Sequence, residues 1–326
     1  MLEVLDLPGN AHSVHGVGQR AFERVEDARR RLGSVFGVRP SRIVFTSGAT
    51  EANALAMHGS RRWLASAAEH PSVLAWAAGT IPVDSHGVTC EPTENADGYA
   101  VMLANNETGV IQPIADARAW ATRRSARLHV DATQGPARMV LPDALWSADS
   151  VSLSAHKFGG PQGVGALVVG EHEAEPEREA LLRGGPQERG RRAGTLNVAG
   201  IVGMAAAAEA AERGALRALR DELEEGLRGL GGAIIGERAQ RLDNTSCVRF
   251  GDLDAADVVI ALDLAGVQVS AGAACASGAS ERSHVLRAMG IPGSAVRISI
   301  GFATTAADVH GAIAALARIL PAKDLK

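Results

Sequence analysis

Lys157 has the sequence setting that points most directly to covalent chemistry. It follows the apolar-leaning run 149–153 and the short segment Ser154-Ala155-His156, and two glycines follow shortly after it. Lysine is costly to bury unless it is neutralised or bonded. A lysine at the mouth of a buried strand, among small residues, can form a Schiff base with an aldehyde cofactor. A surface loop with one solvated lysine is the alternative that this stretch alone leaves open.

Cys275 is a second candidate, because it lies within a run of small residues, Ala271 to Ser280. A structural cysteine normally sits in an apolar periodic pattern. This one does not, which favours a reactive thiol. The other cysteines are Cys90 and Cys247. Three sparse cysteines in a long chain predict neither a disulfide framework nor a zinc site.

A possible anion site follows the short apolar run 43–46, which we expect to be a strand. The run leads into Ser47-Gly48-Ala49-Thr50-Glu51 and the helical pattern 52–58. A strand, a small-residue turn and a helix start together suit an anion, although helix capping alone would explain Ser47 and Thr50. The glycine spacing is not that of a dinucleotide fold or a P-loop.

Polar residues also follow the predicted strands 101–104 and 128–130. The first is followed by Asn105-Asn106-Glu107 and the second by Asp131-Ala132-Thr133-Gln134. Strands alternate with helices, and in an open, mainly parallel α/β sheet ligands bind at the carboxyl edge. Near the C-terminus, Arg297 interrupts an apolar alternation at 295–300, which predicts a carboxylate held bidentately.

The remaining patterns predict two domains after a short N-terminal segment. We expect the segment at 1–12, a large domain at 13–214 and a small domain at 215–326 that carries the cysteine loop. Helical spacing marks 18–32 and 198–230, the latter long enough for two helices. The glycine- and arginine-rich stretch 183–197 suits either a solvated loop or one that reaches a neighbouring subunit or a phosphate.

Composition excludes several classes of protein. The chain has 326 residues, of which 46% are hydrophobic, so two domains can each bury a core. The net charge is -4 and no basic tail occurs, so we expect no nucleic-acid partner. We find neither an apolar run of membrane-spanning length nor a signal peptide, and we therefore expect a cytoplasmic protein with no membrane partner.

Together, these motifs resemble those of the cysteine desulfurases, which belong to the class V aminotransferase group of fold-type I pyridoxal phosphate (PLP) enzymes. The resemblance runs from about Gly9 to Asp308. It implies an α/β fold in which a large domain with a mainly parallel seven-stranded sheet precedes a smaller C-terminal α/β domain. The matching motifs are Gly9-Asn10 with Ser13 and His15, Thr46 to Glu51, Glu69-His70, Asn105-Asn106-Glu107, Asp131 to Gln134, Ser154 to Lys157, Arg192 to Thr195, Gly272 to Cys275 and Val296 to Ser299.

The resemblance also implies roles around the cofactor. Lys157 would hold PLP as a Schiff base and later move protons, while Asp131 would pair with the pyridinium nitrogen. His70 would stack on the ring and take part in catalysis, and Gln134 would bond the phenolic oxygen. The phosphate would be held by Thr50, the Ala49 backbone, Ser154, His156 and the partner subunit's Thr195.

For the reaction, the resemblance implies conversion of L-cysteine to L-alanine in a homodimer without a metal ion. Asn106 and Arg297 would bind the substrate carboxylate, with Asn10 near it. Cys275, as the thiolate, would attack the substrate sulfur, and its persulfide would pass to an acceptor protein for iron–sulfur cluster assembly or thiolation.

Two alternatives stay open. One is a selenocysteine lyase or another PLP enzyme of the group, because the ring chemistry is shared. The other is a PLP-binding scaffold with weak activity, because residues 1–8 do not match the stretch that relatives carry before the Gly-Asn loop.

Overall fold

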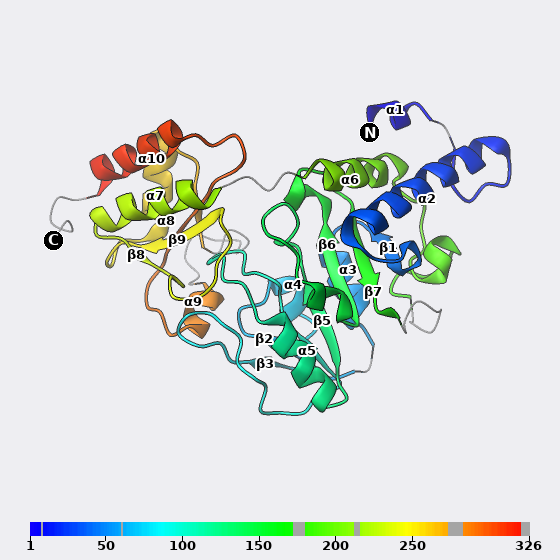
Figure 1. The fold of residues 1–326 in the computed structure, drawn as a ribbon, viewed down its shortest axis with the longest axis horizontal. Coiled ribbons are helices and arrows are strands. Elements are labelled where there is room, and N and C mark those ends of the chain that lie inside the picture. Colours follow the sequence, from blue (N-terminus) through cyan, green and yellow to red (C-terminus); the bar gives the residue numbers. More distant parts are fainter. Residues whose placement is uncertain (8, 60, 172–179, 212–215, 273–282, 321–326) are drawn as a thin grey trace. The chain divides into compact units, whose positions relative to one another are not determined.

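The computed structural model of the chain describes residues 1–7, 9–59, 61–171, 180–211, 216–272 and 283–320 (Figure 1). Its contacts divide the chain into two compact units. The first comprises Met1–Thr80, Glu91–Leu103 and Pro113–Glu212, and the second Ile81–Cys90, Ala104–Gln112 and Arg213–Lys326.

Two early segments, 81–90 and 104–112, thus group with the C-terminal unit, whereas we expected every residue of 13–214 in one domain. Backbone pairing explains the grouping of the second segment. Val110 forms an antiparallel bridge with Arg241, and the Ile111 N–H donates to the Gln240 carbonyl at 2.8 Å. Thr89 and Gly87 of the first segment both bond the Gln112 side chain, which fastens one segment to the other.

The first unit is built on a seven-stranded sheet of order β1-β7-β6-β5-β4-β2-β3 (Figure 1). The pairs β2–β4, β4–β5 and β5–β6 are parallel, whereas β7 is antiparallel to both β6 and β1. The expected fold class, with its mainly parallel seven-stranded sheet, is confirmed. The strands are β1 (Ile43–Thr46), β2 (Trp63–Ser66), β3 (Gly79–Ile81), β4 (Gly98–Ala100), β5 (Arg127–Asp131), β6 (Ser150–Ser154) and β7 (Gly165–Val169).

Strand β4 ends before the run 101–104 that we predicted as a strand. The chain beyond β4 nevertheless keeps bonding to β5. The N–H of Val101 donates to the His129 carbonyl at 3.0 Å, and the N–H of Leu103 donates to the Asp131 carbonyl at 2.8 Å. The apolar pattern therefore predicted an extended segment correctly, but the strand itself lies at 98–100, just before the predicted run.

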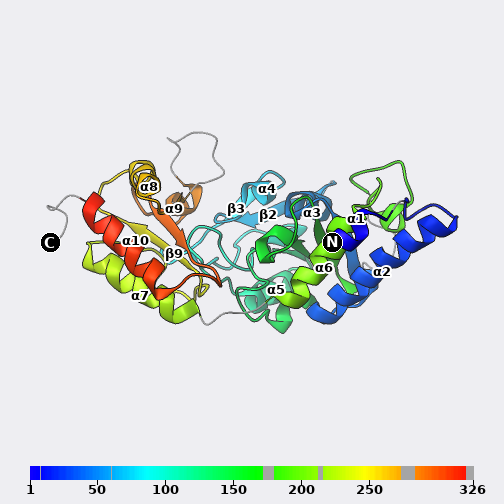
Figure 2. The same cartoon turned by 90° about the horizontal axis from the view of Figure 1, so that it is seen from above.

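Helices cover both faces of this sheet. Val44 packs with Leu55 of α3 in one hydrophobic cluster, whereas the Arg29 guanidinium of α2 lies 4.6 Å from the ring centroid of Phe45. Neighbouring strand residues point to opposite faces, so α3 and α2 lie on opposite sides. Helix α6 lies beside α2 (Figure 2). The helices are α1 (Leu2–Leu5), α2 (Gly16–Phe36), α3 (Ala49–Met57), α4 (Pro71–Leu74), α5 (Ile114–Arg123) and α6 (Val198–Ala210).

The second unit contains a four-stranded antiparallel sheet of order β10-β11-β9-β8. Its core packs Leu223 and Leu227 of α7 with Val248, Leu262 and Leu316. The strands are β8 (Ala233–Ile234), β9 (Thr245–Arg249), β10 (Ser270–Ala271) and β11 (Val296–Ser299). The helices are α7 (Leu216–Gly229), α8 (Ala255–Leu264), α9 (His284–Ala288) and α10 (Ala306–Ile319). Within the described ranges of the chain, none of the helices combines the length and apolar character that a membrane span requires.

Candidate active site

The ends of β1 and β6 bring two of the predicted motifs side by side. Thr46 and Ser154 both lie opposite Gly165 of β7, which separates the two strands. A Cβ atom on Gly165 would lie 2.6 Å from the Gly48 Cα, so only glycine lets the turn after β1 approach this closely. The turn that begins at Ser47 is therefore held next to the end of β6.

Helix α3 begins in this turn, and groups suited to an anion surround its start. Ser154 Oγ and His156 Nδ1 lie 3.0 Å apart, and both Thr50 and His156 are exposed. Partial burial of the His156 ring lowers its pKa, and the positive charges of Lys157 and Arg138 lower it further. The N-terminal end of a helix carries a partial positive charge, which favours an anion such as phosphate.

Asp131 ends β5 and is only 6% exposed. Its Oδ1 accepts the Thr133 N–H at 2.9 Å, and its Oδ2 accepts Asn53 Nδ2 at 2.8 Å. Across the parts of the chain that the structure describes, no cationic side chain forms an ion pair with Asp131. A buried carboxylate of this kind favours a cationic partner. Gln134 is buried three residues further along.

His70 is coupled to Asp131 through two intervening side chains. It caps α4, its Nδ1 accepts the Ser72 N–H at 3.1 Å, and it lies 2.7 Å from Ser72 Oγ. Ser72 Oγ in turn accepts Asn53 Nδ2 at 3.0 Å. The predicted ring-stacking and ring-nitrogen residues therefore belong to one hydrogen-bonded chain.

Glu69, next to His70, is fully buried. Its burial, and then the negative charge of Asp131, raise the pKa of this carboxyl well above its usual range, although the backbone N–H groups of His70 and Met102 oppose the shift. The surroundings of Glu69 therefore favour its uncharged form over its charged form.

Lys157 lies in a short 3₁₀ turn, Ala155–Phe158, directly after β6. Gly159 ends that turn in the left-handed region, at φ 87°, where glycine is favoured. The Lys157 side chain is partly buried, and its carbonyl accepts Arg138 Nη2 at 3.3 Å. Because β5 and β6 are parallel, Lys157 and Asp131 lie at the same edge of the sheet. The sequence holds only two other lysines, Lys323 and Lys326.

The motif that ends in Thr195 also reaches the start of α3. Arg192 binds Glu51 with two nitrogens, at 2.8 and 3.2 Å, and Glu51 Oε2 accepts the Ser47 N–H at 2.8 Å. Thr195 is exposed and lines a small hollow with Thr46 and Ser47. Two motifs far apart in the sequence are thus joined beside the turn at the start of α3.

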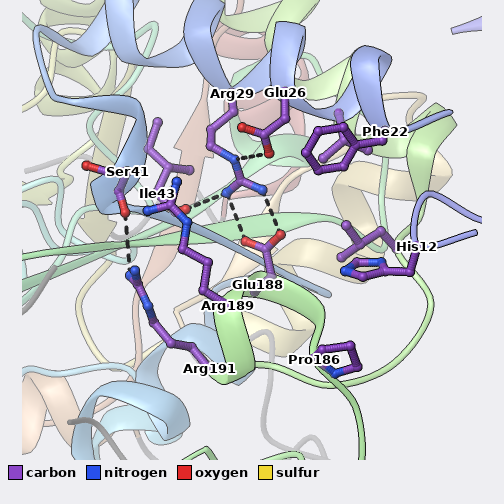
Figure 3. A pocket seen from close by; sticks show the side chains of 12 residues that line it. His12, Phe22, Glu26, Arg29, Ser41, Ile43, Pro186, Glu188, Arg189 and Arg191 are labelled. Atoms are coloured by element: carbon purple, nitrogen blue, oxygen red, sulfur yellow. Dashed lines mark hydrogen bonds and ion pairs between the residues drawn. The ribbon is translucent and has the colours of Figure 1, made fainter. Parts of the chain in front are cut away.

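A separate pocket of about 230 Å³ lies on the α2 side of the sheet and contains none of the predicted site residues (Figure 3). Arg29 lies there between Glu26 and Glu188, and it bonds both Glu188 oxygens at 2.7 and 2.9 Å. Glu188 Oε2 also accepts the Phe45 N–H at 2.8 Å. These buried bonds fasten the glycine- and arginine-rich stretch to α2 and β1, which gives the pocket a structural role.

The second unit holds two of the predicted substrate-binding residues, Asn106 and Arg297. Arg297 Nη1 donates to the Asn106 carbonyl at 3.0 Å, and no carboxylate within the described ranges forms an ion pair with Arg297. The carboxylate partner that we predicted from the sequence is therefore not supplied by this part of the chain. An incoming carboxylate would suit the guanidinium.

Glu107 neighbours Asn106 and is 3% exposed. Burial raises the pKa of Glu107 to about 7, while its bond from Ser283 Oγ, at 2.6 Å, and the charge of Arg297 act in the opposite direction. Glu107 Oε2 would lie 2.8 Å from a Cβ atom on Gly272. Gly272 and Ser283 are the described residues on either side of 273–282, so Glu107 contacts both.

Asn10 and Cys275 complete the predicted set. Asn10 is exposed, and its Oδ1 accepts the His12 N–H at 3.0 Å. Cys275 lies outside the described residues. Of the other cysteines, Cys90 is exposed, whereas burial raises the pKa of Cys247 to about 12. Among the described residues, no group of three or more histidine, cysteine or acidic side chains could hold a metal ion.

The motifs in the sequence did not include Asn53, Ser72 or His129. All three belong to the polar network behind Asp131. One signal was available for Asn53, because it lies three residues after Thr50 within an otherwise apolar helical run. A polar side chain on a buried helical face needs a hydrogen-bonding partner.

Comparison with known proteins gives one consistent family. Residues 2–311 match the model of the aminotransferase class-V family. A cysteine desulfurase of Cereibacter sphaeroides is 41% identical over 334 residues, covering 92% of this chain and 86% of that protein. One of Rhodobacter capsulatus is 40% identical, with 96% and 89% covered. The solved structure of a NifS-like protein superposes with a TM-score of 0.86 at 33% identity, covering 98% of this chain and 94% of that one.

Proposed function

Because the chain belongs to the class V aminotransferase family, we propose that it is a PLP-dependent cysteine desulfurase, which converts L-cysteine to L-alanine and leaves the sulfur on Cys275. One observation carries the proposal. A buried carboxylate with no cationic partner in the described chain, Asp131, shares a sheet edge with Lys157 and with the start of helix α3.

The residues at this edge fit PLP in charge and in chemical type. Asp131 suits a protonated ring nitrogen, Lys157 an aldehyde, and the start of α3 with Ser154 and His156 a phosphate. When bound, PLP supplies an electron sink for the negative charge left by removal of the substrate Cα proton. We assign the remaining cofactor contacts to Ala49, Thr50, His70 and Gln134, and to the partner subunit's Thr195.

Around the reaction, the protein's own residues bind, orient and move protons. Asp131, oriented by Asn53 and by the Thr133 N–H, would pair with the ring nitrogen of the cofactor. Lys157 would take the proton from the substrate Cα and return one to the product. Arg297, with Asn106, would bind the substrate carboxylate, and Asn10 would assist. Between these two proton transfers, Cys275 would attack the substrate sulfur as the thiolate, so that the S–S bond of the persulfide forms as the substrate Cβ–S bond breaks.

We also propose that the protein acts as a homodimer and hands the sulfur to an acceptor protein. The exposed Thr195, held near the start of α3 by Arg192, is placed where a second subunit could use it. The sulfur acceptor would supply iron–sulfur cluster assembly or a thiolation pathway.

Reductive trapping tests the covalent site. Borohydride reduction of the PLP-loaded protein, followed by peptide mass spectrometry, should place the cofactor on Lys157. The assignment is unusually clean because the other two lysines fall within the last four residues. Lys157→Ala should give no trapped adduct. Trapping on Lys323 or Lys326 alone would contradict the proposal.

The sulfur step has its own test, with two matched controls. The protein is incubated with L-cysteine while alanine and protein persulfide are measured. Cys275→Ala should lose both products, whereas Cys90→Ser and Cys247→Ala should keep them. Cys247 is buried and its pKa is about 12, so it is protonated at neutral pH. Normal turnover by Cys275→Ala, or a strong preference for selenocysteine, would overturn this function.

A further inference from the structure

Asn53 uses its whole hydrogen-bonding capacity inside the first unit. Its Nδ2 donates to Asp131 Oδ2 at 2.8 Å and to Ser72 Oγ at 3.0 Å. Its Oδ1 accepts from Ser152 Oγ at 2.5 Å and faces His129 Nε2 at 3.0 Å. Asn53 is completely buried, and an amide offers two donors and two acceptor positions. Each of the four is therefore occupied by a different side chain.

These bonds fix the direction of every proton around Asn53. The carboxylate of Asp131 only accepts, so the nitrogen of the amide must face it and the oxygen must face His129. His129 Nε2 then carries a proton, since Asn53 Oδ1 cannot donate. His70 Nδ1 accepts the Ser72 N–H and so carries no proton, which makes the Ser72 hydroxyl the donor of the bond to His70 Nδ1, 2.7 Å away.

His70 is consequently held in one tautomer. Its Nδ1 accepts from both the hydroxyl and the backbone N–H of Ser72, so in the neutral ring the proton resides on Nε2. A single amide thus reaches two predicted cofactor residues. It orients the Asp131 carboxylate directly and sets the protonation of His70 through Ser72.

Asn53 also ties this network to the turn at the start of α3. It lies four residues after Ala49 and three after Thr50 on helix α3, so the three residues share one side of the helix. One rigid element therefore carries the residues assigned to the phosphate and the residue that holds Asp131. A shift of α3 would move both together.

We propose that Asn53 is a positioning residue for the cofactor, which fixes the Asp131 carboxylate and, through Ser72, keeps His70 as the Nε2–H tautomer. The inference rests on the proposed function for its cofactor. Its structural content, the tautomer of His70, does not depend on the cofactor. Ser72 is the positioning residue of the second branch alone.

Two measurements separate the branches. PLP affinity is measured by titrating cofactor-free protein and following its visible absorption. The tautomer of His70 is measured by ¹⁵N NMR of histidine-labelled, cofactor-free protein. Asn53→Ala should weaken PLP binding about tenfold or more, because it removes a hydrogen bond to a buried charge. Ser72→Ala should change the affinity less than about threefold, because it leaves the bond from Asn53 to Asp131 in place.

Both substitutions should raise the Nδ1–H fraction of His70. The control is Ser150→Ala, which removes the bond to His129 Nδ1 and touches neither branch. It should leave both readouts unchanged. Unaltered PLP affinity in a folded Asn53→Ala protein would overturn the role at Asp131. An unaltered His70 tautomer in Ser72→Ala would overturn the second branch, from Asn53 through Ser72 to His70. Ser72→Ala decides this point if Asn53→Ala does not fold.

Failure of the proposed function gives a different result. A wild-type protein that does not bind PLP would show no cofactor absorption, and one that binds PLP but acts on another substrate would absorb yet form no alanine from cysteine. In both cases the His70 tautomer would still respond to Ser72→Ala.

Discussion

The acids of the two units are held in different ways. In the first unit, Asp131 accepts a hydrogen bond on each oxygen, and the surroundings of its neighbour Glu69 favour the uncharged form. In the second unit, Glu107 accepts a bond from Ser283, and its pKa of about 7 lies at physiological pH. The first carboxylate is fixed in its orientation by two hydrogen bonds, whereas the second changes charge near neutral pH.

The difference between the two acids follows from the groups that surround each of them. In the role we propose for Asp131, a buried carboxylate that pairs with a cofactor cation gains from being oriented in advance, because no reorganisation is then needed at the moment of reaction. Glu107 lies near Arg297, whose charge favours the ionised acid, while burial favours the neutral acid. These opposing influences leave its charge sensitive to small changes in pH.

Asp131→Asn changes the carboxylate of the first unit and should have the largest effect on activity. The asparagine amide has no charge with which to keep a ring nitrogen protonated. Its NH₂ group would also face a hydrogen-bond donor, either Asn53 Nδ2 or the Thr133 N–H, in place of the oxygen that accepts from that donor in the wild type. Alanine production should fall of the order of 10³-fold. Asp149→Asn is the matched control, because Asp149 is bonded to Arg118 and the Leu128 N–H at the start of β6. Near-normal turnover by Asp131→Asn would contradict the assignment.

Glu107→Gln should remove the pH dependence of stability that arises from Glu107. The pKa of Glu107 rises from an ordinary 4.5 to about 7 on folding, so the native state binds more protons between these values. The contribution of Glu107 to the free energy of unfolding is therefore fully present below pH 4.5 and is lost as the pH rises through 7. Wild-type stability should lose about 3 kcal/mol across this window, and the variant should not show that loss.

Chemical denaturation at pH 5 and pH 8 measures the Glu107 effect. Glu69→Gln provides the reference, because Glu69 also has a raised pKa and gives a slope of the same sign. The difference between wild type and Glu107→Gln isolates Glu107. Equal slopes in those two proteins would refute a raised pKa at this position.

Ser283→Ala should have a smaller effect in the same place. It removes the 2.6 Å bond to Glu107, which favours the ionised acid, so the pKa of Glu107 should rise further. The protein should lose about 2 kcal/mol of stability at pH 8, where Glu107 would otherwise be ionised, and less at pH 5. Thermal melts at the two pH values check this, with Ser299→Ala on the exposed end of β11 as the control.

His156→Gln should give the smallest effect, on the pH dependence of anion binding. The pKa of His156 is lowered in the free protein, and a bound phosphate would raise it, so binding should take up a proton. Phosphate affinity of the cofactor-free protein should therefore rise about 3-fold from pH 8 to pH 6. Calorimetric titration measures this rise, which should vanish in His156→Gln and persist in the exposed control His12→Gln.

The sequence by itself determined the fold class and the family. Strand ends carry their polar residues in contiguous runs, such as Asp131 to Gln134 and Ser154 to Lys157, so local pattern was enough to bring them to one sheet edge. A parallel sheet places the ends of its strands together whatever the details of packing. The roles assigned to the individual side chains remain predictions.

Only the tertiary structure decided how those residues are held. Asn53 meets Asp131 across 78 residues of sequence and Ser152 across 99, and no periodicity links such positions. The pKa of Glu107 likewise depends on burial and on Ser283, 176 residues away. Hydrogen-bond direction and desolvation are properties of neighbours in space, which is why the sequence named the acids but the fold set their charge and orientation.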